Sequence, residues 1–152
     1  MKIHGNFLSI LFITVVSCSL QSNKIEKTVG INQETLVEFE EINHVNVKLI
    51  NSEYKILKSQ DEINGIYKKI NKENPSPRKN PIPSYSESET YIVIQPNINQ
   101  TDFIVSEVLE NGKNLEVKIQ QYYNPEFKNK KNPASIIKLN KKSNYDNVNI
   151  KQ

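Results

Sequence analysis

The segment that begins at Ser59 constrains the fold most, because it is the clearest helical pattern in a chain made largely of short strand-like runs. Ser59 is a residue type that caps helix N-termini, and Glu62, three residues later, completes the pattern of a capping box. Apolar residues then recur at i, i+3, i+4 and i+7, at Ile63, Ile66, Tyr67 and Ile70. One amphipathic helix is therefore predicted here, although Gly65 costs it about 1 kcal/mol relative to alanine.

The rest of the folded region is predicted to be β-structure. Strand patterns fall at residues 36–42, 45–49, 54–57, 91–94, 103–109, 115–121, 135–139 and 145–150. The run YIVI at 91–94 is continuously apolar, which favours a central strand buried on both faces, and Asn111-Gly112 favours a hairpin. Residues 72–84 hold four prolines, which favours an extended loop or, alternatively, a short recognition segment. We expect an α+β domain, with one amphipathic helix packed on a mostly antiparallel sheet of about six or seven strands.

The first 17 residues have the composition of an export signal. Lys2 supplies a positive charge, and residues 7–16 are apolar apart from Ser9 and Thr14. This apolar run is too short to span a bilayer, because a spanning helix takes about 20 residues. Export is therefore expected, and a cytosolic protein with a buried N-terminal helix is the weaker alternative.

Val15-Val16-Ser17-Cys18, directly after the apolar run, resembles the signal motif of bacterial lipoproteins. The resemblance implies cleavage between Ser17 and Cys18 and a lipid on the Cys18 sulfur, which anchors the protein to a membrane. It divides the chain into a signal peptide at 1–17, a lipidated cysteine with a flexible tether at 18–35, and a domain at 36–152. Ser19, in place of aspartate, implies delivery to an outer membrane. An ordinary secretory signal with a coincidental cysteine is the alternative.

Charge and cysteine content exclude several classes of function. The net charge is +3, and lysine is interleaved with glutamate along most of the chain, so no nucleic-acid-binding face is predicted. The basic stretch KNKK at 128–131 is interpreted as a solvated loop. Cys18 is the single cysteine, so neither an intramolecular disulfide nor a cysteine-based metal site is expected.

The sequence offers little for catalysis. His44 is the one histidine outside the leader, and no acidic partner for it is apparent from its neighbours. Glu38 and Glu40 are two residues apart, as are Glu87 and Glu89; such pairs can serve as general acid and base, but the polar face of a strand explains them equally well. The glycines are isolated, so no phosphate-binding loop is present. We expect a protein that is not an enzyme and has no cofactor or metal.

The order of elements resembles the domain named after PrcB, a bacterial protease-complex subunit. The similar region opens with VEFEEINHVNVKLINSEYKILKSQDEINGIYKKI, in which Ile56, Ser59, Glu62 and Ile63 match the family's entry into its helix. Ser84-Tyr85-Ser86, the strand YIVI and the hairpin FIVSEVLENGKNLEVKI follow in the family's order. The closing strand pattern is matched by Pro133, Ala134, Ile136, Ile137, Lys138 and Leu139. The family's Gly-Gly-Tyr-type turn is replaced here by Gln100-Thr101-Asp102-Phe103.

This resemblance implies a non-catalytic cell-envelope module that associates with an envelope or secreted protein, such as a protease, and stabilises or restrains it. The aromatic residues considered as contacts for a partner or ligand are Tyr85, Phe103, Tyr122, Tyr123 and Phe127. A lipoprotein that binds a glycan or another small ligand is the alternative function. For the last three aromatics, packing within a loop is the alternative role.

Overall fold

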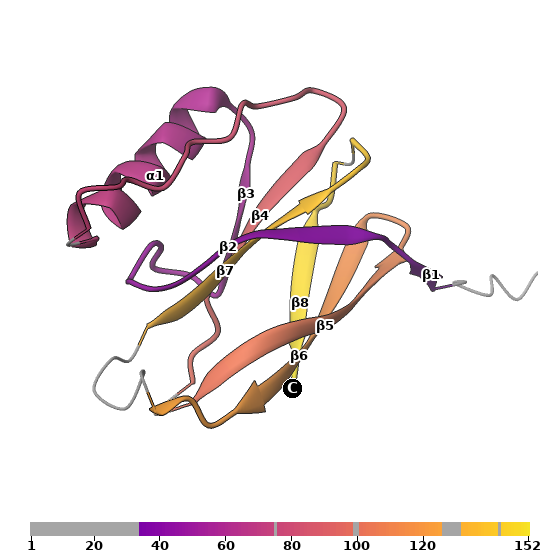
Figure 1. The fold of residues 1–152 in the computed structure, drawn as a ribbon. Helices are drawn as coiled ribbons and strands as arrows, with labels where there is room; N and C mark the ends of the chain where they lie inside the picture. The colour runs from indigo at the N-terminus through magenta and orange to yellow at the C-terminus, as the bar shows by residue number, and fades with distance from the viewer. Residues whose placement is uncertain (1–33, 75, 99–100, 126–131, 143) are drawn as a thin grey trace, which may run out of the picture. The chain divides into compact units, whose positions relative to one another are not determined.

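The computed structural model describes residues 34–152 apart from residues 75, 99–100, 126–131 and 143. These residues belong to one compact unit, Ile31–Gln152, and comprise eight strands and one helix (Figure 1). In chain order the elements are β1 (Thr35–Leu36), β2 (Phe39–Asn46), β3 (Tyr54–Leu57), α1 (Gln60–Glu73), β4 (Thr90–Ile94), β5 (Asp102–Asn111), β6 (Asn114–Tyr122), β7 (Pro133–Leu139) and β8 (Asn147–Lys151). The α+β class is confirmed. The signal peptide, Cys18 and most of the tether lie outside the described residues.

The strands form two sheets, where one had been expected. Sheet A has the order β1-β5-β6-β8 and sheet B the order β2-β7-β4-β3. All the pairs are antiparallel except β6 with β8, which is parallel. The prediction of a single sheet was wrong because alternation of polar and apolar residues identifies strands without saying which strands pair.

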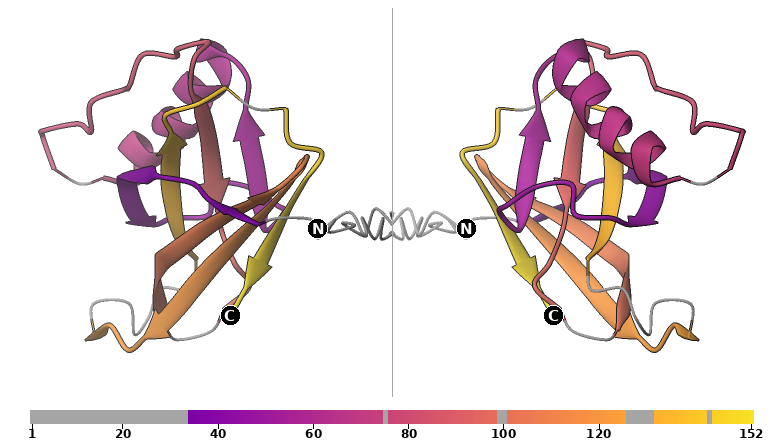
Figure 2. Two further views of the ribbon diagram at one scale, coloured as in Figure 1. Left: turned by 90° about the vertical axis from the view of Figure 1, so that its right-hand side faces the viewer. Right: turned by 90° about the vertical axis from the view of Figure 1, so that its left-hand side faces the viewer.

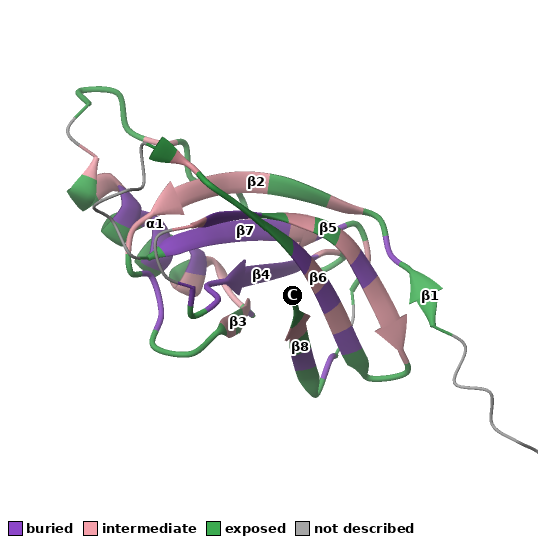
Figure 3. Cartoon of the chain, turned by 90° about the horizontal axis from the view of Figure 1, so that it is seen from below, coloured by how far each residue is buried: buried purple, intermediate pink, exposed green. Residues whose placement is uncertain are grey.

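Sheet B is the middle layer of three, with α1 on one face and sheet A on the other (Figures 1 and 2). Its central strands β4 and β7 are therefore buried on both faces, as Figure 3 shows by their colour. This explains the continuous apolar run in β4 and confirms it as a central strand. Sheet A has one face on the core, so β6 alternates between buried and more exposed residues.

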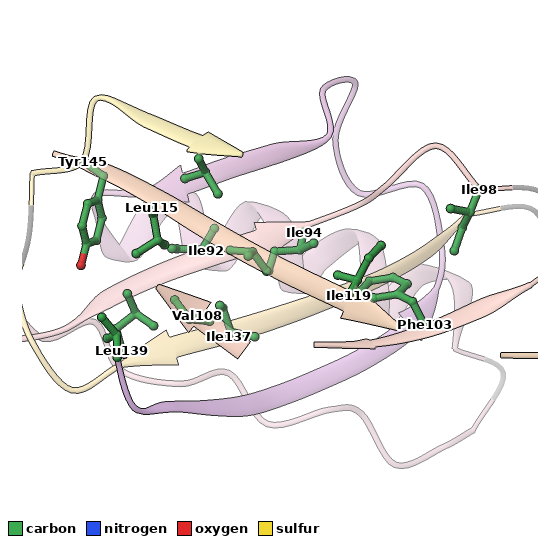
Figure 4. Close-up of a cluster of buried hydrophobic side chains, with 13 residues drawn as sticks. Ile92, Ile94, Ile98, Phe103, Val108, Leu115, Ile119, Ile137, Leu139 and Tyr145 are labelled. Atoms are coloured by element: carbon green, nitrogen blue, oxygen red, sulfur yellow. The ribbon is translucent and has the colours of Figure 1, made fainter. Parts of the chain in front are cut away.

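Two apolar clusters hold the layers together. Between the sheets, isoleucine and leucine side chains of sheet B meet apolar side chains of sheet A, and the fully buried Phe103 lies beside Ile119 at one end of this cluster (Figure 4). Between sheet B and the helix, the apolar stripe of α1 packs on Leu57, Val93 and Ile136. Burial of apolar surface from water, at about 25 cal/mol per Å², is the main stabilising term in both clusters.

The helix forms as the sequence predicts, and its predicted apolar face is buried. The Ser59 hydroxyl accepts a hydrogen bond from the backbone N–H of Glu62 at 3.3 Å, and the Glu62 carboxylate accepts one from the Lys58 N–H at 2.6 Å. This arrangement is a capping box in which the glutamate bonds to the N–H of the residue before the N-cap, Lys58, and not to that of Ser59 itself. The helix continues to Glu73, into the proline-bearing segment, before the expected loop begins.

Two details of the strands differ from expectation. Residues 36–42 and 45–49, predicted as two strands, instead give the short β1 and the continuous β2, and residues 47–50 form a loop against α1. The hairpin between β5 and β6 is confirmed, but Asn111 pairs with Asn114, so Gly112 and Lys113 form the turn. Gly112 has a φ of 61°, which glycine adopts without steric cost.

The loop at residues 47–50 is fixed by one buried side chain, Gln95. Its amide oxygen accepts hydrogen bonds from the N–H groups of Leu49 and Ile50, at 2.9 and 3.0 Å. Its amide nitrogen donates to the carbonyls of Val47 and Asn132, at 3.0 and 3.2 Å. A buried polar group must be satisfied in this way, and here four bonds tie three segments together.

Candidate functional site

The described part of the chain contains one histidine, His44, and its position depends on an irregularity in β2. Glu41 and Asn43 pair with consecutive residues of β7, so Ile42 is the extra residue of a β-bulge. Residues 41 and 44 of a regular strand would point to opposite faces. The bulge changes this parity and places Glu41 and His44 on one face, together with Ser135 of β7.

His44 joins the two sheets. Its Nδ1 lies 2.8 Å from Oε1 of Glu41 on the same strand, and its Nε2 lies 2.8 Å from Oδ1 of Asp102 at the start of β5. The imidazole ring also packs against Phe103, with ring centroids 5.4 Å apart. The side chains of His44, Glu41 and Asp102 are 23%, 35% and 1% exposed, so the bond to Asp102 is the better shielded from solvent.

Asp102 organises the groups around the histidine. Besides the bond to His44, its carboxylate accepts hydrogen bonds from the Phe103 N–H at 2.8 Å, the Tyr122 hydroxyl at 2.9 Å and the Asn124 amide at 3.0 Å. Burial raises the pKa of this carboxyl, but the hydrogen bonds, led by those from Asn124 and His44, hold it below its ordinary value of 3.8. Asp102 is therefore ionised at neutral pH although it is buried.

The same geometry sets the charge of the other two members. Burial alone would lower the pKa of His44, but its bonds to Glu41 and Asp102 and their negative charges raise it above 6.5. The pKa of Glu41 is lowered, chiefly by the His44 hydrogen bond and also by a 2.6 Å bond from the Ser135 hydroxyl, against an opposing effect of burial. We name Glu41, His44 and Asp102 the histidine latch.

The histidine latch lacks the arrangement of a catalytic triad. Both ring nitrogens of His44 face carboxylates, so neither is directed at a hydroxyl nucleophile. The nearby Ser135 is fully buried and donates to Glu41. Within the described ranges, no group of three or more His, Cys, Asp or Glu side chains is suited to holding a metal ion. The latch can hold two sheets together and can change protonation.

The glutamates considered as pairs of general acid and base do not lie in such pairs. Glu40 of β2 and Glu89 before β4 both approach Lys138 of the intervening β7, at 2.9 and 3.5 Å. Glu89 also accepts a 2.6 Å hydrogen bond from Tyr91, so each of these carboxylates is engaged in a cross-strand contact. Glu38 and Glu87, their neighbours in sequence, form no ion pair with Lys138 in the described ranges.

The predicted aromatic contact residues are distributed between surface and core. Tyr122 and Tyr123 are 42% and 66% exposed at the end of β6. Tyr85 is half-buried, with its ring centroid 6.2 Å from that of Tyr91. Phe103 is fully buried between the sheets, which corrects its selection as a contact residue: it is the core anchor of the β5 strand. Phe127 lies outside the described residues.

Ile104 is an exposed apolar residue near Tyr122 that is not among the aromatic residues predicted as contacts. Ile104 is 44% exposed and opposes Gln120, while Tyr122 opposes Asp102, so Ile104 and Tyr122 are diagonal neighbours on the outer face of sheet A. We name Ile104, Tyr122 and Tyr123 the tyrosine patch. Side chains alternate along a strand, so once Phe103 is assigned to the core, Ile104 is expected to point outward. No sequence pattern indicated the contact of Asp102 with His44, because the two residues are far apart in sequence.

Comparisons with protein-family models, curated proteins and solved structures find no match to this chain. The resemblance to the PrcB-like domain thus stays a prediction. In the part of the chain that the structure describes, no helix is long and apolar enough to cross a membrane. Ser17 and Cys18, the predicted cleavage and lipidation residues, lie outside that part.

Proposed function

We propose that this protein is a non-catalytic, lipid-anchored interaction module of the bacterial cell envelope that binds a protein partner through the tyrosine patch. The exposure of Ile104, Tyr122 and Tyr123 carries the proposal: they are three of the five large apolar residues exposed in the described ranges, and all three come from the same end of the β5–β6 hairpin. Tyrosine is enriched at protein interfaces because it combines an apolar ring with a hydrogen-bonding group.

Hydrogen bonds fix the position of Tyr122 in the tyrosine patch. Tyr122 is held by the bond from its hydroxyl to Asp102, and Asp102 is itself held by His44 and the Phe103 N–H. A ring fixed before binding loses less conformational entropy when the partner arrives. This fixed position favours a binding surface over a loop that merely packs on itself.

The leader and the family resemblance suggest where the partner is found. The lipoprotein-like motif at residues 15–18 supports an anchor on Cys18 and an outer-membrane location. The PrcB-like order of elements suggests an envelope or secreted partner, with a protease as the leading candidate. The engagement of both His44 nitrogens by carboxylates speaks for binding rather than catalysis.

The test is site-specific photo-cross-linking in cells that produce the full chain. A benzophenone amino acid is placed at Tyr123, and in a matched control at Ile82, which is 49% exposed and far from the hairpin in sequence. We expect one discrete adduct from position 123 that is absent from position 82, with its partner identified by mass spectrometry. No adduct at 123, or the same set of adducts from both positions, would contradict the proposal.

A glycan ligand is a second candidate for the same surface. The exposed amide side chain of Gln120 lies on the same face of β6 as Tyr122, and an amide beside an aromatic ring suits sugar hydroxyls. Binding of the full chain to a glycan array that is lost on Tyr123→Ala would favour this candidate. Retention of a cross-linked protein together with an empty array would dismiss it.

A further inference from the structure

The two sheets leave two unpaired edges next to each other. β3 is the last strand of sheet B and β8 the last strand of sheet A. A hollow of about 240 Å³ is lined by residues 56–58, at the end of β3, and by residues 144–146, just before β8. Figure 2 shows the chain before β8 passing beside β3. We name the β3 edge together with this hollow the seam.

The backbone of β3 presents free hydrogen-bonding groups to the seam. The register with β4 and the 2.7 Å bond from Gln95 N–H to the Glu53 carbonyl show that Glu53, Lys55 and Leu57 face β4. Tyr54 and Ile56 therefore direct their backbone groups outward. The Tyr54 carbonyl accepts a bond from the Ser52 hydroxyl; among the described residues, the outward N–H groups and the Ile56 carbonyl have no partner.

Apolar side chains at the seam are only partly covered by the rest of the protein. Tyr54 and Ile56 of β3 and Ile150 of β8 are partly buried and pack on the cluster between the sheets. An added strand would cover them and pair with the outward backbone groups, because an unpaired sheet edge is a template for another strand.

The charges in the hollow indicate which part of a strand would lie there. The hollow contains two acidic side chains, and each has a lysine partner elsewhere: Asp146 lies 3.6 Å from Lys113, and Glu89 lies 3.5 Å from Lys138. Its own lysines, Lys58 and Lys142, are exposed and form no ion pair with a carboxylate of the described residues. The nearby Glu62 carboxylate pairs with Lys55 at 3.0 Å, and the pKa of Glu62 is lowered chiefly by the hydrogen bond from the Lys58 N–H and also by the charge of Lys58. The exposed ammonium groups of Lys58 and Lys142 are therefore what the hollow offers to an anionic group.

We propose that the seam binds the C-terminal segment of a partner protein as an added β-strand, with its terminal carboxylate between Lys58 and Lys142. Lys58 directly follows the C-terminal end of β3 and Lys142 lines the same hollow, so the segment runs parallel to β3. Backbone pairing with Tyr54 and Ile56 tolerates many sequences, and the carboxylate selects chain ends. This site is separate from the tyrosine patch, and the proposal does not depend on the function proposed for that patch.

The test compares two pools of random heptapeptides, one with free C-terminal carboxylates and one with C-terminal amides, on the immobilised full chain in detergent. We expect the carboxylate pool to be retained about tenfold better, because charge-assisted bonds are lost in the amides. The Lys58→Gln/Lys142→Gln variant should lose this difference. The matched Lys68→Gln/Lys72→Gln variant, on the exposed face of α1, and Tyr123→Ala should keep it.

The best retained peptide then separates strand addition from simple charge capture. Alternate N-methylation of its backbone should abolish binding, and the unmodified peptide should shift the amide resonances of Tyr54 and Ile56. Equal retention of the two pools, retention of neither, or a difference that survives in Lys58→Gln/Lys142→Gln would overturn the proposal. A difference lost in Tyr123→Ala instead would place the peptide on the tyrosine patch and also overturn it.

Discussion

Replacing His44 by glutamine should make the stability of this protein respond to pH in a different way. Glutamine keeps polar atoms at the position but cannot carry the positive charge that Glu41 and Asp102 surround. His44 makes two charge-assisted hydrogen bonds, both 2.8 Å long, and one of them reaches a carboxylate that is 1% exposed. Loss of one partner from such a shielded ionic network costs about 3 kcal/mol, so the variant should be less stable by about this amount at pH 6.

The difference should shrink as the pH rises. Because the folded-state pKa of His44 lies above its ordinary 6.5, its stabilisation is fully present below pH 6.5 and is lost as the pH rises through the folded pKa. A neutral imidazole donates from one nitrogen only, which leaves the other lone pair facing a carboxylate. Each unit by which the pKa is raised corresponds to about 1.4 kcal/mol of this loss.

The carboxylates set the lower limit of the range. The folded-state pKa values of Glu41 and Asp102 lie below the ordinary 4.5 and 3.8, so their contribution is present above those values and is lost as the pH falls through the folded pKa values. The histidine latch should therefore stabilise the fold most between about pH 4.5 and 6.5.

Urea unfolding of the wild type and His44→Gln, followed by circular dichroism between pH 5 and 9, measures this difference. Gln120→Ala, an exposed change on β6, controls for general effects of pH. A difference between the wild type and His44→Gln that stays constant from pH 5 to 9, or grows with pH, would refute the assignment of a charged histidine between the two carboxylates.

Three further predictions follow from other parts of the chain. Gln95→Ala should lower the free energy of unfolding by about 3 kcal/mol, because the loop groups bonded to its amide lose their partners; urea unfolding beside Gln120→Ala measures it, and a cost equal to that of the control would contradict it. Gly65→Ala should raise the free energy of unfolding by about 1 kcal/mol, because an added Cβ meets no atom within 4 Å on the exposed side of α1; an unchanged or lower midpoint would count against it. Cys18→Ala should abolish palmitate labelling and move the protein from the membrane to the soluble fraction, with Ser19→Ala as the control; labelling that persists in the variant would exclude Cys18 as the lipid site.

Local sequence patterns were sufficient for elements whose signals lie within a few residues. The cap at Ser59 and the apolar stripe that follows it gave the helix, because capping and 3.6-residue periodicity are local effects. The apolar run at 91–94 indicated a strand buried on both faces, and Asn111-Gly112 indicated the hairpin. The turn residue Gly112 does need a positive φ, although the turn is displaced by one residue from the predicted pair.

Long-range geometry decided the rest. The division into two sheets depends on which strands pair, and neighbours along the chain do not carry that information. The histidine latch depends on the extra residue Ile42, which reverses the alternation of side chains in β2, and on Asp102, which is 58 residues from His44 in sequence. A bulge and a distant carboxylate leave no periodic signal, so the sequence presents His44 as isolated, and only the tertiary structure surrounds it with two negative charges.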